Sequence, residues 1–152
     1  MSRFTVPSVS VAEAKKSLPV YLERAREHEP QIVTRPDRDE VVILGLADFR
    51  EVLRMPHRRF ETDVAIHPGE ATVTLPQFRI IGIGNNVDEA TEDVLAKLRE
   101  YAAQYVHRYA FYSQTDRREL LPLVLRFLAT PLDEQLELLL ESEGVEAEPA
   151  IA

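Results

Sequence analysis

The chain of 152 residues contains no cysteine. This absence excludes disulfide bonds, zinc–thiolate sites and cysteine nucleophiles. The sequence also has neither a glycine-rich phosphate-binding loop nor a G-x-S-x-G motif. The four histidines, at positions 28, 57, 67 and 107, are too scattered for a metal-binding motif such as H-E-x-x-H. We therefore expect a protein that is not an enzyme and that binds no cofactor and no metal.

Long apolar runs are also missing from the sequence. The apolar stretch from Leu120 to Ala129 is interrupted by Pro122 and Arg126, so no run approaches the length that spans a membrane. The first residues, M-S-R-F-T-V-P, lack the apolar core of a signal peptide. These features predict a cytoplasmic protein without a membrane partner.

The charge is unevenly distributed along the chain. Apolar residues make up 45% and charged residues 29%, a composition typical of globular proteins, and the formal net charge is −8. Residues 1 to 60 carry 11 Lys and Arg against 9 Asp and Glu, a net charge of +2. Residues 61 to 152 carry 7 against 17, a net charge of −10. A mildly basic segment followed by a strongly acidic one suggests two partners of opposite charge.

The segment from Ser8 to Leu53 carries the clearest secondary-structure signals. Ser10 and Glu13 form an S-x-x-E capping box, which predicts that a helix begins here. Pro19 falls inside this helix, where we expect a kink because proline cannot donate a backbone hydrogen bond. Apolar residues recur along one helical face, at Val11, Ala14, Leu18, Leu22 and Ala25, with Tyr21 beside them.

Two short β-branched runs after this helix predict a hairpin. They are Ile32-Val33 and Val41-Val42-Ile43-Leu44, joined by the turn Pro36-Asp37-Arg38-Asp39. A short helix over residues 46–54 is predicted next, with Phe49, Val52 and Leu53 on one side. The predicted order is therefore strand, helix, hairpin, helix.

These residues, in this order, resemble the Phd/YefM antitoxins over roughly the first third of the chain. The family's E-A-(R/K) step in the first helix is matched by Glu13-Ala14-Lys15, and its I-x-x-R step in the hairpin by Ile32-Val33-Thr34-Arg35. Its strand followed by L-x-x-(F/Y) is matched by Leu46-Ala47-Asp48-Phe49. The resemblance implies a β-α-β-β-α unit that dimerises and binds operator DNA.

The resemblance also implies that Lys15 and Arg35 occupy the two basic positions with which family members contact DNA. Arginine can donate two hydrogen bonds to guanine, whereas lysine acts as a point charge. Lys16, Arg38 and Ser10 are further DNA-binding candidates, although Lys16 and Arg38 are equally explained as ordinary solvated charges. A symmetric dimer would require an inverted repeat in the operator.

The middle of the chain predicts a linker and then a β-β-α unit. Residues 56–70 show a weak pattern interrupted by Pro56 and Pro68-Gly69, which indicates a linker. Strands are predicted over 71–75 and 78–83. A long helix capped by Asn86 and Glu89 follows, with one face formed by Val87, Ala90, Val94, Leu98, Tyr101, Tyr105, Tyr109 and Tyr112.

The tyrosines of this long helix have helical spacing on an otherwise apolar face. That pattern indicates a core or a dimer interface rather than a base-stacking platform. The segment 71–112 is similar to the HicB-like antitoxin domain, although a generic β-β-α unit explains the same pattern.

The C-terminal third predicts two helices. The first begins after Thr115, with Pro122 shifting its start downstream, and the second begins at Thr130-Pro131. From Thr130 to the end the chain has seven acidic residues and no basic one. Such an amphipathic acidic helix suits a groove on a basic toxin, although the same residues could instead close the core of this part of the chain. The toxin-binding candidates are Leu132, Leu136, Leu139, Glu134 and Glu137.

We therefore predict an α+β protein with four regions. Residues 1–55 form the Phd/YefM-like unit, 56–70 a linker, 71–142 a β-β-α unit with C-terminal helices, and 143–152 a disordered tail. The leading hypothesis is an antitoxin of a type II toxin–antitoxin system, which binds its operator as a dimer or higher homo-oligomer and neutralises a cognate basic toxin. The alternative is a stand-alone transcriptional regulator or interaction protein whose C-terminal domain dimerises or senses a ligand, with no toxin partner.

A third hypothesis is a metal-dependent nuclease that uses the acidic cluster early in the long helix. Asp88, Glu89, Glu92 and Asp93 could hold a divalent cation. Acidic residues in a first helical turn are better explained by the positive end of the helix dipole.

Overall fold

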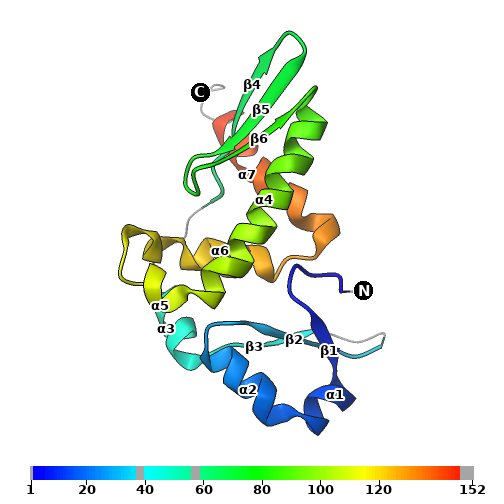
Figure 1. Ribbon diagram of the computed structural model, residues 1–152, viewed down its shortest axis with the longest axis vertical. Helices are drawn as coiled ribbons and strands as arrows, with labels where there is room; N and C mark the ends of the chain where they lie inside the picture. The colour runs from blue at the N-terminus through cyan, green and yellow to red at the C-terminus, as the bar shows by residue number, and fades with distance from the viewer. Residues whose placement is uncertain (1, 37–39, 56–58, 148–152) are drawn as a thin grey trace. The chain divides into compact units, whose positions relative to one another are not determined.

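The computed structural model describes residues 2–36, 40–55 and 59–147, with Arg54 and residues 142–147 described by their backbone alone. The chain is a mixed α+β protein with two separate three-stranded sheets (Figure 1). Within the described ranges, no helix combines the length and the apolar character needed to cross a membrane.

The chain folds into two compact units, and neither is a single continuous segment. The first unit comprises Met1–His57 and Ala102–Leu132, and the second comprises Arg58–Tyr101 and Asp133–Ala152. This division differs from the predicted boundary near residue 70, because the long helix α4 (Val87–His107) contributes residues to both units. The apolar periodicity of α4 continues without interruption through Tyr101 and Ala102, so nothing in the sequence marks the boundary between the two units at this point.

The sheet of the first unit consists of β1 (Ser8–Ser10), β2 (Gln31–Thr34) and β3 (Val41–Ile43), in that order. β1 is parallel to β2, and β3 is antiparallel to it. Helices α1 (Val11–Lys16) and α2 (Leu18–Arg26) connect β1 to β2, and α3 (Leu46–Arg54) follows β3. The predicted order of strand, helix, hairpin and helix is observed, with the tip of the hairpin at 37–39 outside the described residues.

The predicted kink at Pro19 is observed as a break between α1 and α2. Ser10 caps α1, since its Oγ accepts a hydrogen bond from the backbone N–H of Glu13 at 3.1 Å. Ser17 ends α1, and Pro19 lies in the first turn of α2. Proline is tolerated there because the first backbone N–H groups of a helix have no partner within it.

The core of the first unit includes Ala14, Tyr21 and Val33. Residues 102–132 add the end of α4, α5 (Tyr109–Tyr112), a 3-10 helix η1 (Asp116–Leu120) and α6 (Leu121–Leu128). The predicted long helix thus ends at His107 rather than continuing through Tyr112, and the remaining turn forms α5.

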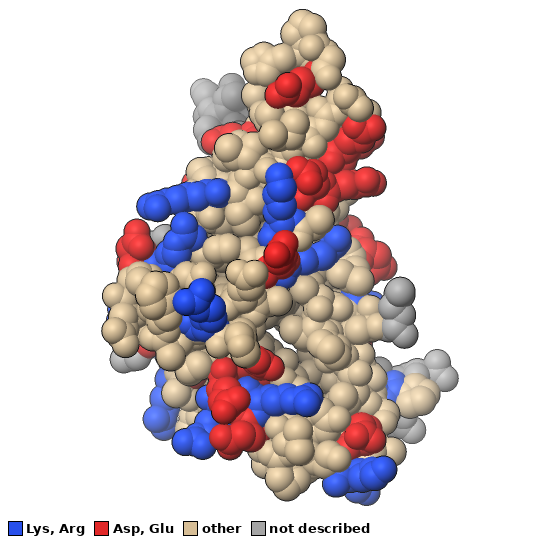
Figure 2. Space-filling model, in the orientation of Figure 1, with Lys and Arg blue, Asp and Glu red and all other residues tan. Residues whose placement is uncertain are grey.

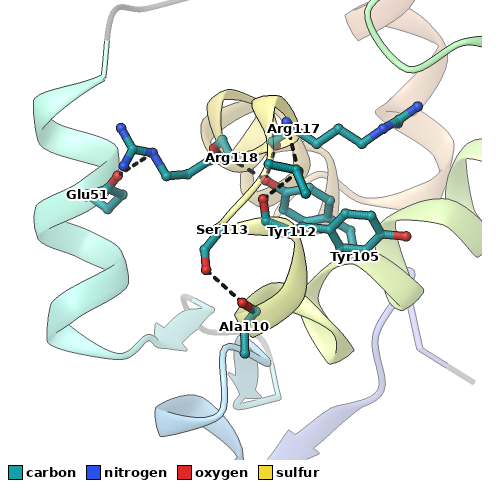
Figure 3. Close-up of polar contacts among 8 residues, drawn as sticks. Glu51, Tyr105, Ala110, Tyr112, Ser113, Arg117 and Arg118 are labelled. Atoms are coloured by element: carbon teal, nitrogen blue, oxygen red, sulfur yellow. Dashed lines mark hydrogen bonds and ion pairs between the residues drawn. The ribbon is translucent and has the colours of Figure 1, made fainter.

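The tyrosines Tyr105 and Tyr109 are buried, as the core interpretation predicted. The Tyr105 hydroxyl donates to the carbonyl oxygen of Arg117 at 2.6 Å, and its ring stacks on Tyr112 (Figure 3). Tyr109 contacts the ring of His28 edge-on, with centroids 4.9 Å apart. Burial raises the pKa of Tyr109 to about 12, so its hydroxyl is neutral at physiological pH.

A hydrogen-bonded contact and an ion pair connect segments of the first unit. The Nδ1 atom of His28 lies 2.8 Å and 3.0 Å from the two carboxylate oxygens of the buried Asp48. Arg118 pairs with Glu51 of α3 at 3.5 Å (Figure 3). A buried carboxylate needs such partners, because transfer from water into the protein interior is costly for an unpaired charge.

The sheet of the second unit is an antiparallel meander of β4 (Asp63–His67), β5 (Glu70–Leu75) and β6 (Ile80–Gly84). The predicted strands over 71–75 and 78–83 correspond to β5 and β6. β4, however, lies where the sequence predicted a linker. All five of its side chains are exposed, so β4 is held by its backbone pairing to β5 rather than by burial. The Pro68-Gly69 turn signal is confirmed, and Gly69 adopts a φ of 76°.

Helix α4 packs directly on the backbone of β6. A Cβ added at Gly82 would lie 2.2 Å from the carbonyl oxygen of Ala90 and 2.6 Å from the backbone nitrogen of Val94. Only glycine permits this approach. The facing helix residues Ala90, Val94 and Leu98 are fully buried.

The second unit is completed by α7 (Gln135–Ala147), which follows the 3-10 turn η2 (Leu132–Glu134). Gln135 is fully buried and accepts a hydrogen bond from Nε of Arg99 at 2.8 Å. Thr62 donates to the carbonyl oxygen of Leu139 at 2.9 Å. The helix continues to Ala147, so residues 143–147 are helical rather than part of the predicted disordered tail, and residues 148–152 lie outside the description.

We predict that Gly82→Ala lowers the free energy of unfolding by about 3 kcal/mol, because the added methyl group overlaps backbone atoms of α4. Urea unfolding followed by circular dichroism measures this change. Ile81→Ala is the matched control, since Ile81 is exposed on the neighbouring position and should change stability far less. An unchanged midpoint for Gly82→Ala would contradict the close packing.

Candidate functional site

The parallel pairing of β1 and β2 brings two DNA-binding candidates, Ser10 and Arg35, to one edge of the first sheet, and Lys15 lies in the last turn of the helix that begins there. Ser10 ends β1 and lies in register with Thr34, which ends β2. α1 begins directly after Ser10, and Arg35 directly follows Thr34. Because parallel strands end at the same edge, Ser10, the start of α1 and Arg35 share that edge.

The basic side chains near this edge are exposed. In α1, Ala14 is buried and Val11 packs against the core. With about 100° between successive helical residues, Lys16 projects away from the core and Lys15 to its side. Arg35 is also exposed. Within the described residues, none of these three cations is paired with an acidic side chain.

The remaining two DNA-binding candidates are Ser10, which caps a helix, and Arg38. The Ser10 hydroxyl oxygen accepts the Glu13 N–H as a helix cap, and its proton can still be donated to a ligand. Arg38 lies outside the described residues. The sequence-based choice of Lys15, Lys16 and Arg35 as solvent-accessible cations agrees with the structure, while a contact with DNA stays a prediction.

The two units differ strongly in charge. The first unit has 13 Lys and Arg against 11 Asp and Glu, a net charge of +2. The second has 5 against 15, a net charge of −10. On the face shown in Figure 2, basic and acidic side chains of the first unit are interspersed rather than separated into one large patch. This face therefore offers a polyanion a few separate cations and no broad basic surface.

The toxin-binding candidates are divided by the fold. Leu139 is only 1% exposed and belongs to the core of the second unit, so its assignment to a binding surface was wrong. Leu132 falls in the first unit, whereas Glu134, Leu136 and Glu137 are exposed in the second. Helical periodicity alone did not separate Leu136 from Leu139, because both lie near the boundary of the apolar face.

The exposed surface of α7 nevertheless combines leucines with acids. Leu136 and Leu140, one helical turn apart, are 43% and 45% exposed. Glu137 lies beside them, and Asp133 is exposed in the preceding 3-10 turn η2. We call these four residues the α7 stripe. It offers apolar contact and negative charge at the start of α7.

The acidic cluster at the start of α4 serves as a set of caps. Asn86 Oδ1 accepts the Glu89 N–H, and Glu89 Oε2 accepts the Asn85 N–H, both at 2.9 Å. Asp93 pairs with Lys97 at 2.9 Å and accepts the Ile83 N–H, and these two contacts lower the pKa of Asp93. Nowhere in the described part of the chain do three His, Asp or Glu side chains gather as a metal site would require. The carboxylates of Glu89 and Asp93 thus already have structural partners.

Eight large apolar side chains of the first unit are 41–67% exposed. They include Leu18 and Leu22, which the sequence placed on the apolar face of the first helix, and Phe49 and Leu53, which it placed on one side of the next helix. The eight side chains come from α2, β3 and α3: Leu18, Val20, Leu22, Val41, Val42, Leu46, Phe49 and Leu53. We call this set the first-unit apolar surface. Periodicity shows that a face is to be covered, but it does not show whether the cover comes from the same chain.

Comparison with known proteins supplies the identity of the fold. A family model described as PHD-like, "Antitoxin of toxin-antitoxin, RelE / RelB, TA system", matches residues 6–142. No curated protein matched.

A crystal structure from Syntrophomonas wolfei subsp. wolfei, described as "an antitoxin part of a putative toxin/antitoxin system", has a similar fold. The TM-score is 0.51 at 17% identity, over 88% of this chain and 96% of that one. At this identity the similarity concerns the fold alone, whereas the family model covers both units. The chain therefore belongs to the PHD-like family of toxin–antitoxin antitoxins.

Proposed function

We propose that this protein is the antitoxin of a type II toxin–antitoxin system, which binds its own operator as a dimer and neutralises a cognate toxin through its acidic unit. The observation that carries the proposal is the family match over residues 6–142, which spans both units. The protein would act in the cytoplasm by binding alone, without catalysis or a cofactor.

DNA binding is proposed for the edge of the first sheet that holds Ser10 and Arg35, together with Lys15 and Lys16 of the adjoining helix α1. A guanidinium at the end of a strand can donate two hydrogen bonds to a guanine, and Lys15 and Lys16 can neutralise phosphates. The Ser10 hydroxyl can donate to a phosphate oxygen. With so few cations, specific contacts rather than bulk charge would supply the affinity.

Dimerisation is proposed through the first-unit apolar surface. Apolar area removed from water contributes about 25 cal/mol per Å², so covering eight large side chains in a second copy is favourable. β3 is an edge strand within this surface. A two-fold axis would present two copies of the basic edge to an inverted repeat.

Toxin binding is proposed for the second unit. Its net charge of −10 would attract a basic partner and accelerate the encounter. The α7 stripe would then fill an apolar groove on the toxin, with Glu134 and Glu137 meeting basic residues at the rim. Because the family description names RelE and RelB, we propose a toxin of the RelE type.

We predict that Lys15→Ala combined with Arg35→Ala weakens binding to an inverted-repeat operator fragment about 100-fold at moderate salt, since each contact contributes about 1–3 kcal/mol. The log–log slope of affinity against salt should also decrease by about 2. Mobility-shift titrations at several salt concentrations measure both effects.

The matched control for this pair is Arg26→Ala with Arg108→Ala. It removes two exposed positive charges from the same unit, away from the proposed edge. Its affinity should stay within a few-fold of the unmodified protein. Equal losses of affinity in the two double variants would show that overall positive charge, rather than Lys15 and Arg35, determines binding, and would refute the assignment of these two residues.

We predict that Leu136→Ala with Leu140→Ala abolishes rescue of cells expressing the cognate toxin, the product of the adjacent gene. The two leucines are exposed, so the variant should fold normally while losing its apolar contact with the toxin. Growth on co-expression and a pull-down of the toxin measure the loss.

Ile81→Ala with Ile83→Ala is the control for the leucine pair, because it truncates two similarly exposed side chains of the same unit. It should rescue growth fully. Normal rescue by the leucine variant would show that the α7 stripe does not bind the toxin.

A further inference from the structure

The two edge strands of the second sheet, β6 and β4, differ in whether their outward backbone groups are hydrogen-bonded. At β6, Lys97 Nζ donates to the carbonyl oxygen of Ile81 at 2.8 Å, and Asp93 Oδ2 accepts the N–H of Ile83 at 2.9 Å. The two side chains also form an ion pair with each other at 2.9 Å. Helix α4 thus occupies the outward backbone groups of β6, which prevents another strand from pairing there.

The register of the sheet shows which backbone groups are free at the opposite edge. Since Ile81 and Ile83 direct their backbone groups outward, their partners Thr74 and Thr72 direct theirs toward β4. There they bond to Asp63 and Ala65, the residues in register with them. The backbone N–H and C=O groups of the alternate residues on β4, at positions 64 and 66, therefore point out of the sheet.

This outer edge of β4 is open and apolar. Within the described residues, no hydrogen bond from outside the sheet reaches Val64 or Ile66. Their side chains are 41% and 72% exposed, and they lie on the same sheet face as Val73 and Ala71, with which they are in register. Natural edge strands are usually protected by charged side chains, a proline or a cover. In the part of the chain that the structure describes, β4 carries Asp63 at its end but has no lysine, proline or hydrogen-bonded cover at Val64, Ala65 or Ile66.

We propose that β4 pairs antiparallel with β4 of a second copy of this chain, about a two-fold axis through Ala65. Val64 of each copy then lies opposite Ile66 of the other, and each of these two pairs forms two backbone hydrogen bonds. The two three-stranded sheets join into a single six-stranded sheet. The exposed side chains of Val64 and Ile66 from both copies then cover one another.

The polar residues at the two ends of β4 are complementary in this register. Asp63 lies directly opposite His67 of the second copy on the other face of the sheet, and the reverse pair forms across the axis. A carboxylate can accept a hydrogen bond from an imidazole N–H in such a pair, and no two carboxylates are placed opposite each other. Ala65 meets its own copy on the axis, where its small side chain permits the short Cα separation of a non-hydrogen-bonded pair.

This interface does not depend on the proposed function of the first unit. If the first-unit apolar surface also forms a dimer, the two interfaces together link the chains into tetramers or longer assemblies. They can therefore be removed one at a time, and DNA binding reports on the first interface alone.

The oligomeric state of the full chain tests the β4 pairing. Ile66→Lys places a charge at the open edge, and we expect its mass in sedimentation or light scattering to fall to half that of the unmodified chain or less, with operator binding retained. Ile83→Lys is the control, because it alters an equally accessible isoleucine at the edge already closed by Asp93 and Lys97. Its mass should not change. An unchanged mass for Ile66→Lys would overturn the proposal.

The absence of natural cysteine allows a direct test of the register. Ala65→Cys should form a disulfide-linked dimer on mild oxidation, whereas Ile81→Cys, exposed on the same sheet face, should not. The cross-link should persist in Val42→Lys, which disrupts the first-unit apolar surface. Equal cross-linking of the two cysteine variants would overturn the proposal. So would a loss of toxin rescue in Ile66→Lys at unchanged mass, which would assign the β4 edge to the toxin.

Discussion

Helix α4 is the element on which both units depend. Its first part supplies Ala90, Val94 and Leu98 to the core of the second unit, and its last part supplies Tyr105 and Val106 to the first. A cut at any point between residues 58 and 101 would separate the N-terminal sheet from helices of its own unit. The two proposed activities therefore belong to one chain that cannot be divided into an N-terminal DNA-binding fragment and a C-terminal toxin-binding fragment.

Local features of the fold could be predicted from the sequence because local interactions determine them. The Ser10 and Asn86 caps, the break near Pro19 and the turn at Gly69 each depend on a few neighbouring residues. β4 could not be predicted, because an exposed edge strand is held by pairing with β5 and buries no side chain. The composition of the units could not be predicted either, since it depends on contacts between distant segments.

The candidate surfaces show the same division between local and distant information. Exposure of Lys15 and Arg35 follows from their positions beside a buried Ala14 and after a strand end, so the sequence sufficed. For Leu139 the sequence did not suffice, because its burial at 1% exposure depends on contacts with segments distant in the chain, which helical spacing does not reveal. The first-unit apolar surface is the most informative failure. Its periodicity correctly marked the faces that require a cover, while the chain itself leaves them open.

The separation of charge gives the account its physical basis. The partition of the chain into units keeps the net charges at +2 and −10, although residues 102–132 lie in the unit opposite to the one predicted. A polyanion and a basic protein can thus be bound by different units without competing for the same side chains. The proposed operator and toxin surfaces share no residue.

The central claim is that these two surfaces are independent, and a single mobility-shift experiment tests it. Equimolar cognate toxin is added to a preformed complex of the full-length protein with its operator fragment. The account predicts a slower-migrating ternary complex that contains protein, toxin and DNA. Release of free DNA at equimolar toxin would show that toxin and operator compete for one surface, and would contradict the account.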